Sequence, residues 1–224
     1  MTAPDIVGRR IGLEREPIAI VDHFHPDPSS LRAFAATARF EPARRHYPGV
    51  RAALPDDYFQ AVRPALSQVL AGVFGHRAGV ALLDASFSIV TTPPDALSVQ
   101  QRVPHYDAVE PDRIALVHYM GGEGAGGTAF YRHRATGFET IDATRASAYL
   151  DAVRAEVASA PPPSAYIDGS TPFFEQISTA EARPNRAVIY RSALLHSGKI
   201  PATATLSADP LRGRLTVTAF LSLG

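Results

Sequence analysis

Two histidines and one aspartate, His105, Asp107 and His196, constrain the fold of this chain more than any other feature of its sequence. On a β-strand the side chains of residues i and i+2 project from the same face, so His105 and Asp107 can approach one metal ion while Tyr106 points elsewhere. His196 follows an apolar run at residues 187–190, which is typical of a buried strand. The third ligand is therefore expected to come from a different strand, which the fold must bring beside the first.

The chemistry of these three side chains indicates a metal that keeps open positions. Two imidazoles and one carboxylate on one face of an octahedral ion leave three positions free, an arrangement typical of non-haem Fe(II) oxygenases. Eighteen residues after His196, Arg214 opens a run in which Arg214 and Thr216 share one face. A guanidinium matches a carboxylate, and a hydroxyl two residues on adds a donor. Arg214 and Thr216 are therefore predicted to hold the far end of a dicarboxylate.

With these motifs the chain resembles the Fe(II)/2-oxoglutarate-dependent oxygenase superfamily, and most of all the prolyl-hydroxylase-type enzymes and their bacterial relatives. The resemblance covers roughly residues 85–224. It includes residues 113–120, a glycine-rich turn and residues 126–131, in the order which that superfamily shows between its HxD motif and its distal histidine. Residues 18–24 resemble the opening of such proteins more weakly. The usual aromatic partner of 2-oxoglutarate is not clearly placed, so Tyr119 is the candidate for that role.

The resemblance implies a mainly β fold, a double-stranded β-helix (a jelly-roll or cupin-like barrel) with N-terminal helices packed outside. It implies that His105, Asp107 and His196 are the catalytic residues and bind Fe(II), with 2-oxoglutarate as cosubstrate and O2 as co-reactant. The implied reaction is oxidation of an unactivated C–H bond, expected as a hydroxylation, coupled to decarboxylation of 2-oxoglutarate to succinate. Asp107 also argues against the halogenating branch, where a halide takes the place of the carboxylate.

Two alternatives stay open at this point. One is a non-catalytic metal- or ligand-binding module of the same fold, which would bind Fe(II) without producing succinate. The other is a cupin-like dioxygenase that does not use 2-oxoglutarate, which an Arg214 side chain pointing away from the metal would favour. The substrate is open as well, since a peptide, an amino acid and a small natural product all fit such a site.

Length and composition set further bounds. The 224 residues are most simply one domain, with residues 1–84 as a helical support region and residues 85–224 as the double-stranded β-helix core. Lys plus Arg and Asp plus Glu both number 22, so there is no electrostatic case for nucleic acid or an anionic membrane as partner. The lack of cysteine excludes disulfides and thiolate chemistry. Without a long apolar stretch or a signal-peptide pattern, a cytoplasmic location is expected. The oligomeric state is open, a homodimer included.

The hydrophobic pattern predicts helices first and strands afterwards. Helices are expected at residues 28–38, from 56 or 57 to about 74 with a kink or break at Pro64, and at about 144–158. Strands are expected at residues 85–91, 97–103, 114–120, 128–131, 187–190 and 215–223. The glycine-rich residues 121–127 lack the lysine of a phosphate-binding loop and predict a hairpin turn.

Two further positions on the expected strands are candidates for the cosubstrate pocket. The two-residue period that pairs His105 with Asp107 also places Gln101 on the ligand face, where it would contact the cosubstrate or line the barrel as a satisfied amide. Only one of His118 and Tyr119 can point into the barrel. An inward Tyr119 would offer its phenol to the cosubstrate carboxylate, and His118 would then be a surface or interface residue.

Two short basic segments are candidates for substrate contacts. Residues 131–134 and residues 44–51 are expected either as solvated faces or as parts of the barrel mouth. In the second case Arg132, Tyr47 and Arg51 would contact an acidic or carboxylate-bearing substrate. A turn follows Tyr47, so residues 44–51 are also a candidate lid.

Overall fold

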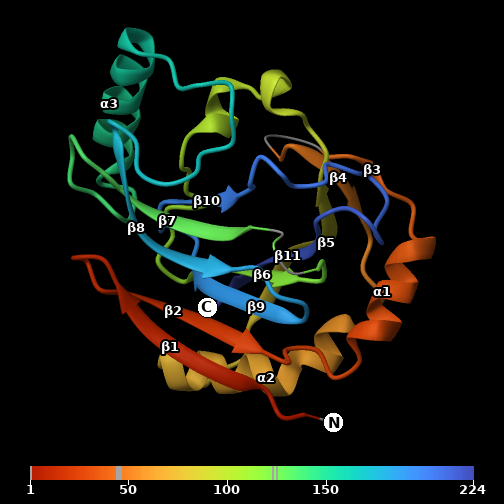
Figure 1. Ribbon diagram of the computed structural model, residues 1–224. Coiled ribbons are helices and arrows are strands. Elements are labelled where there is room, and N and C mark those ends of the chain that lie inside the picture. The colour runs from red at the N-terminus through yellow and green to blue at the C-terminus, as the bar shows by residue number, and fades with distance from the viewer. Residues whose placement is uncertain (1, 44–46, 123, 125) are drawn as a thin grey trace.

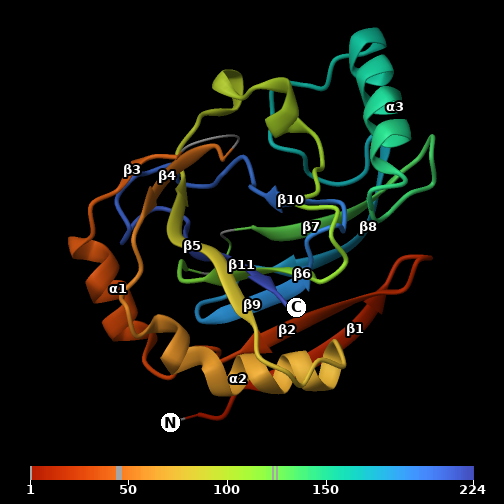
Figure 2. The ribbon, with the colours of Figure 1, turned by 180° about the vertical axis from the view of Figure 1, so that it is seen from behind.

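Two antiparallel β-sheets face each other across the centre of the protein (Figure 1, Figure 2). The structure is a computed structural model that describes residues 2–43, 47–122, 124 and 126–224. The larger sheet contains β1 (Asp5–Ile11), β2 (Glu16–Asp22), β3 (Glu41–Pro42), β4 (Gly49–Ala52), β5 (Ala81–Val90), β6 (Arg113–Tyr119), β9 (Arg186–Arg191) and β11 (Leu215–Ser222). The smaller sheet contains β7 (Gly127–His133), β8 (Phe174–Glu181) and β10 (His196–Lys199). Among the described residues, the strand orders are β1-β2-β9-β6-β11-β5-β4-β3 and β10-β7-β8.

Helices cover the outer faces of both sheets. Helices α1 (Pro28–Thr37) and α2 (Tyr58–Val73) lie against the larger sheet, and α3 (Ala146–Ser159) lies against the smaller one (Figure 1). Three buried clusters hold these layers together: Leu31, Val69 and Phe87 under α1 and α2, Ile18, Phe130 and Tyr190 between the sheets, and Tyr131, Tyr149 and Leu195 under α3. Burying one such side chain contributes about 1.5–3 kcal/mol. The result is the expected double-stranded β-helix with helices outside.

Alternation along the strands decides which side chains face the space between the sheets. On β7, Phe130 points into that space, whereas its neighbours Ala129 and Tyr131 pack under α3. This is the two-residue period of a strand with both faces buried. The strands expected at residues 85–91, 114–120, 128–131, 187–190 and 215–223 are confirmed as β5, β6, β7, β9 and β11.

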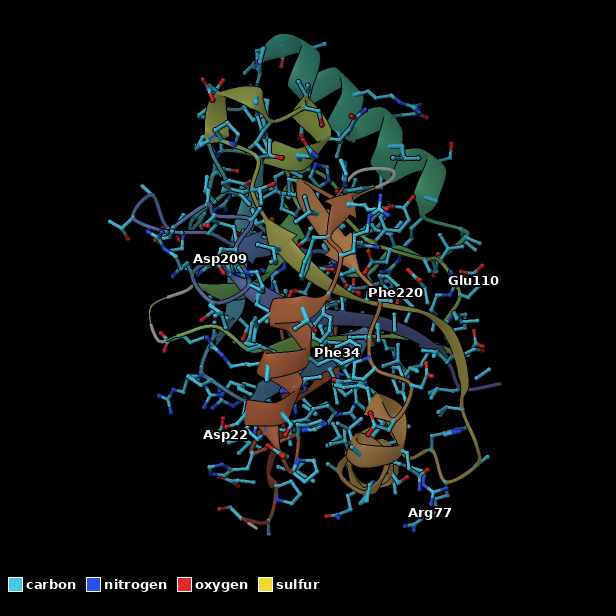
Figure 3. The ribbon with its side chains drawn as sticks, turned by 90° about the vertical axis from the view of Figure 1, so that its right-hand side faces the viewer. Asp22, Phe34, Arg77, Glu110, Asp209 and Phe220 are labelled. Atoms are coloured by element: carbon cyan, nitrogen blue, oxygen red, sulfur yellow. The ribbon has the colours of Figure 1, made fainter. Side chains whose placement is uncertain are left out.

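The three expected helices are present. Helix α1 begins with Pro28 in its first turn, and the Asp27 carboxylate accepts a hydrogen bond from the Ser30 backbone N–H at 3.0 Å. This is the usual way to satisfy a free N–H at a helix start. The sequence predicted a kink or a break at Pro64; α2 is one continuous helix with Pro64 inside it, so the helix is not broken there. Figure 3 shows this helical side of the molecule, with Phe34 on α1 and Arg77 beyond the end of α2.

The strand expected at residues 97–103 is wrong. The segment forms a short 3-10 helix, Val99–Arg102, after a first one at Pro94–Ala96. Ser98 caps the second turn, where the Gln101 side-chain oxygen accepts a hydrogen bond from the Ser98 N–H at 2.9 Å. Such local side-chain bonds offer the backbone an alternative to a strand.

Two further expectations about connectivity need correction. Residues 1–84 supply β1 to β4 as well as α1 and α2, so this region is more than a helical support. The glycine-rich residues 121–127 do not close a hairpin, because β6 lies in the larger sheet and β7 in the smaller one. The described part of this segment instead leads the chain from one sheet to the other.

Candidate metal centre

Backbone pairing brings the HxD motif beside the distal histidine. His196 begins β10, which pairs with β7 so that His196 lies opposite Phe130. His105 forms a bridge to His196, with N–H to carbonyl hydrogen bonds of 2.9 and 2.8 Å in the two directions. The Asp107 N–H donates to the Ser192 carbonyl at 2.8 Å. These bonds fix His105 against β10, which carries His196, and Asp107 against the segment between β9 and β10.

The three side chains converge on one point. His105 Nε2 lies 3.8 Å from Asp107 Oδ1, and His196 Nε2 lies 3.4 Å from Asp107 Oδ2. One ligand atom from each residue falls within 4.8 Å of the other two. Neighbouring ligands of an octahedral ion lie roughly 3 Å apart when each bond is about 2.1 Å. The observed separations are slightly wider, so a first-row metal ion fits between them after a small inward movement.

The hydrogen bonding of His196 leaves the correct nitrogen for a metal. Its Nδ1 lies 2.8 Å from the Leu194 carbonyl oxygen. A carbonyl oxygen only accepts hydrogen bonds, so the proton sits on Nδ1 and the lone pair of Nε2 faces Asp107. Such a bond to the second ring nitrogen orients metal-ligating histidines in proteins. The donor set therefore fits a divalent metal.

The two histidines differ in their surroundings. The His196 side chain is 6% exposed, whereas that of His105 is 52% exposed. The ring of Tyr190 lies edge-on to His196, with 4.7 Å between the ring centroids. Burial raises the pKa of Tyr190, and the nearby Asp107 carboxylate raises it further. The site therefore has one buried wall and one side that opens toward solvent.

A buried cation lies elsewhere between the sheets. Arg214, which precedes β11, is 7% exposed and donates from Nη2 to the Gly127 carbonyl at 2.8 Å. Its guanidinium carbon lies 5.6 Å from the centroid of the Tyr119 ring. Tyr119 is buried, and its hydroxyl lies 2.7 Å from the Thr128 hydroxyl. Because Tyr119 pairs with Thr216 across β6 and β11, both side chains lie on the same face of the sheet.

The hydroxyl of Thr216 is already engaged. It donates to the Ser88 carbonyl oxygen on β5 at 3.1 Å, and the side chain is buried. Thr216 therefore lines the space near Arg214, but its proton points to the backbone of the next strand. Thr216 is therefore not placed to donate to a carboxylate beside Arg214 as predicted, and a second donor would have to come from another residue.

His118 is not the surface or interface residue that was expected. It is fully buried on the opposite face of β6 from Tyr119, under α2. The Tyr58 hydroxyl lies 3.1 Å from its Nδ1, and the Asn185 side-chain oxygen lies 3.0 Å from its Nε2. Burial lowers the pKa of His118 to about 3. Tyr119 is thus the member of the pair that faces the space between the sheets.

Two other candidates, Gln101 and Arg132, form hydrogen bonds with groups of the protein itself. Gln101 stands on the 3-10 helix rather than on a ligand strand, and its carbonyl oxygen caps that turn. Arg132 donates from Nε to Glu139 at 2.7 Å and from Nη1 to Glu175 at 2.9 Å. The charge of Arg132 is therefore neutralised within the protein, and it is not a free cation for a substrate carboxylate.

The segment that was expected at the barrel mouth lies partly outside the described residues, since residues 44–46 are not among them. Within its described part, the Arg51 guanidinium lies 4.8 Å from the centroid of the Tyr47 ring. Arg51 Nη1 also lies 3.6 Å from an oxygen of Asp84. The hydroxyl of Tyr47 is buried and lies near Arg214.

Tyr190 and Leu194 are site residues that the sequence reasoning missed. The signal for Tyr190 was present, because Val188 and Tyr190 share one face of the strand that leads to His196, and that face points between the sheets. The role of Leu194 rests on its backbone carbonyl, which no side-chain pattern reveals.

The fold is a double-stranded β-helix, and it carries a candidate His-Asp-His metal centre. The profile of a family of unknown function, DUF6445, matches residues 2–221, and the chain belongs to this family. No curated protein matches the chain.

Solved structures show a similar fold at low sequence identity. HygX from Streptomyces hygroscopicus, with nickel and 2-oxoglutarate bound, matches with a TM-score of 0.52 and 11% identity over 93% of this chain and 84% of that one. An N-substituted L-amino acid dioxygenase from Burkholderia ambifaria AMMD, in complex with alpha-KG, matches with a TM-score of 0.50 and 11% identity over 99% and 96%. A prolyl-4-hydroxylase from Pseudomonas putida has a TM-score of 0.46 and 16% identity over 94% of both chains.

No helix in the described residues has the length and apolarity needed to cross a membrane.

Proposed function

We propose that this protein is a non-haem Fe(II)- and 2-oxoglutarate-dependent oxygenase. In this proposal His105, Asp107 and His196 bind the metal, and Arg214 binds the remote carboxylate of 2-oxoglutarate. The observation that carries the proposal is the convergence of the three side chains, with Nε2 of His196 freed for a metal by the hydrogen bond from its Nδ1 to Leu194. Bound metal, 2-oxoglutarate and O2 would supply the oxidation of a substrate C–H bond and the conversion of 2-oxoglutarate to succinate.

The spacing between the two candidate subsites supports the use of a dicarboxylate. His196 lies opposite Phe130, and Lys199 lies opposite Gly127, whose carbonyl binds Arg214. These two pairs are three residues apart on the strand, roughly 10 Å. An extended five-carbon diacid fills about this length when one end binds a metal and the other accepts a hydrogen bond from a guanidinium.

The residues between the two subsites would orient the cosubstrate and exclude water. Phe130, Tyr190 and Leu194 belong to the buried cluster between the sheets, and Tyr119 extends the wall toward Arg214. Apolar and aromatic walls strengthen the attraction between Arg214 and a carboxylate, because fewer water dipoles screen it. In this account the protein holds the reactants in place and shields them.

The type of reaction, the class of substrate and the number of domains are also proposals. We propose hydroxylation of a peptide, an amino acid or a small natural product by a cytoplasmic, prolyl-hydroxylase-like enzyme. The 52% exposure of the His105 side chain supports approach of the substrate from that side. We also propose one domain, because β1 to β4 of the N-terminal region complete the larger sheet.

The test is a turnover assay with a matched variant. Purified protein is incubated with Fe(II), 2-oxoglutarate and O2, succinate is measured, and a clarified lysate treated in the same way is searched by mass spectrometry for species that gain one oxygen. Wild-type protein should form succinate and the His196→Ala variant should not. Stoichiometric Fe(II) binding without succinate would instead identify a binding module of this fold.

A further inference from the structure

The hydroxyl of Tyr47 is buried and, among the described residues, makes no hydrogen bond. It lies close to the hydroxyls of Thr216 and Ser88 and to the Arg214 guanidinium, although none of these contacts has the geometry of a hydrogen bond. A buried phenol without a partner is destabilising, and Tyr hydroxyls in protein interiors usually find one. Its position beside a buried cation points to an anionic partner that the described residues do not supply.

The backbone holds Tyr47 firmly in this place. The carbonyl of Pro48 accepts hydrogen bonds from the N–H groups of Thr91 and Thr92, at 3.1 and 3.2 Å. Gly49 packs so closely on β5 that an added Cβ would lie 1.9 Å from the Ile89 carbonyl oxygen. The turn after Tyr47 is therefore docked on the strand that also faces Thr216, and the phenol is positioned before any ligand arrives.

The neighbouring hydroxyls of Thr216 and Ser88 make their hydrogen bonds to groups other than Tyr47. Thr216 donates to the Ser88 carbonyl, and the Ser88 hydroxyl lies 2.8 Å from that of Thr218. Burial raises the pKa of Tyr47, while the charges of Arg214 and Arg51 lower it, and the net direction is upward. The phenol therefore keeps its proton at neutral pH and remains a donor.

We propose that Tyr47 donates a hydrogen bond to the remote carboxylate of 2-oxoglutarate, together with Arg214. The proposal rests on the proposed function, and it moves Tyr47 from the expected substrate contact to the cosubstrate pocket. Residues 47–49, which precede the strands of the metal site, then complete this pocket. Tyr47 becomes a specificity residue that distinguishes 2-oxo acids with a second carboxylate from those without one.

The experiment compares two ligands of equal chain length. Fe(II)-loaded protein is titrated under anaerobic conditions with 2-oxoglutarate and with 2-oxopentanoate, which ends in a methyl group instead of the remote carboxylate. In Tyr47→Phe the affinity for 2-oxoglutarate should fall by about tenfold or more, the effect of losing a hydrogen bond to a charged group. The affinity for 2-oxopentanoate should stay unchanged. A general loss of structure would weaken both.

A matched control and a second readout separate binding from folding. Tyr166 is a nearby tyrosine whose hydroxyl donates to the Thr92 carbonyl at 2.7 Å, so Tyr166→Phe should leave the ratio of the two affinities unchanged. Without ligand, Tyr47→Phe should melt at the same temperature as wild type or higher, because it removes an unpaired buried hydroxyl. A lower melting temperature for Tyr47→Phe would indicate a structural role and overturn the proposal.

The two proposals fail in different ways. If the wild-type protein with Fe(II) does not bind 2-oxoglutarate, the proposed function is wrong. If the wild type binds 2-oxoglutarate and Tyr47→Phe keeps the same preference over 2-oxopentanoate, only the role of Tyr47 is wrong.

Discussion

The space between the two sheets has two polar ends that differ in charge and exposure. At one end the Asp107 carboxylate lies between the imidazoles of His105 and His196, and the His105 side chain is 52% exposed. At the other end the cation Arg214 is buried against Tyr119. The first end gathers electron-pair donors and suits a cation, whereas the second presents a positive charge and suits an anion. This difference is the basis of the proposal that one ligand contacts a metal at the first end and the Arg214 guanidinium at the second.

The largest effect is expected from removing a ligand of the candidate metal centre. In His196→Ala the metal loses a ligand, and the affinity for Fe(II) should fall by more than about 100-fold, since changes behind the ligands alone cost 10-fold to 100-fold. Metal content after dialysis against a weak chelator measures this. His76→Ala, which removes a histidine beyond the end of α2, is the control and should retain the metal. Equal retention by both variants would place the metal elsewhere.

A substitution at the Arg214 end should weaken cosubstrate binding without affecting the metal centre. Arg214→Ala removes the cation that would face the cosubstrate carboxylate, so the affinity for 2-oxoglutarate should fall by 2 to 5 kcal/mol, or roughly 30-fold to several thousand-fold. Metal binding should stay nearly intact. Anaerobic titration with 2-oxoglutarate tests this, and an unchanged affinity would mean that the carboxylate binds at another residue.

Part of this contrast was visible in the sequence, because it depends on residue chemistry. The two-residue spacing of His105 and Asp107 predicted a shared strand face, but residues 105–107 form only an isolated bridge at His105 and not a strand, and Arg214 lies just before β11. The same rule failed for Gln101, since the Ser98 cap favours a 3-10 helix there. A two-residue spacing therefore does not by itself place a side chain on the face of a strand.

The rest depended on contacts between distant segments, which no local pattern encodes. The place of Tyr47 depends on the docking of residues 47–49 on β5, about forty residues later in the chain. His118 is buried because α2 covers that face of β6 and the Tyr58 hydroxyl reaches its ring. Neither partner can be inferred from the residues around them.

His118 allows a test of the outer face of β6, away from both ends. Its pKa is lowered to about 3 in the folded protein, so between pH 6.5 and 3 the unfolded chain binds a proton that the folded chain does not. Stability from this group is therefore complete above pH 6.5 and is lost as the pH falls, at up to about 1.4 kcal/mol per pH unit.

Urea unfolding of wild type and His118→Asn between pH 4 and 7 measures this slope. The variant is less stable at pH 7, but its free energy of unfolding should fall less steeply toward low pH. Parallel curves would show that His118 is not held neutral. Fe(II) affinity at pH 7 should be the same in both proteins, since His118 faces away from the metal centre.

The smallest effect is expected at Thr216. Its hydroxyl proton is bound to the Ser88 carbonyl, so Thr216→Val should weaken 2-oxoglutarate binding by less than about tenfold, about one neutral hydrogen bond. The same anaerobic titration measures this. A loss as large as that of Arg214→Ala would show that the hydroxyl turns toward the carboxylate on binding.

The most direct test of the central claim is a crystal structure of the protein grown anaerobically with Fe(II) and 2-oxoglutarate. The account predicts one metal ion within about 2.0 to 2.2 Å of ligand atoms from His105, Asp107 and His196. It also predicts that the remote carboxylate of 2-oxoglutarate lies against Arg214. A metal bound away from these three side chains, or a 2-oxoglutarate molecule whose remote carboxylate does not contact Arg214, would contradict it.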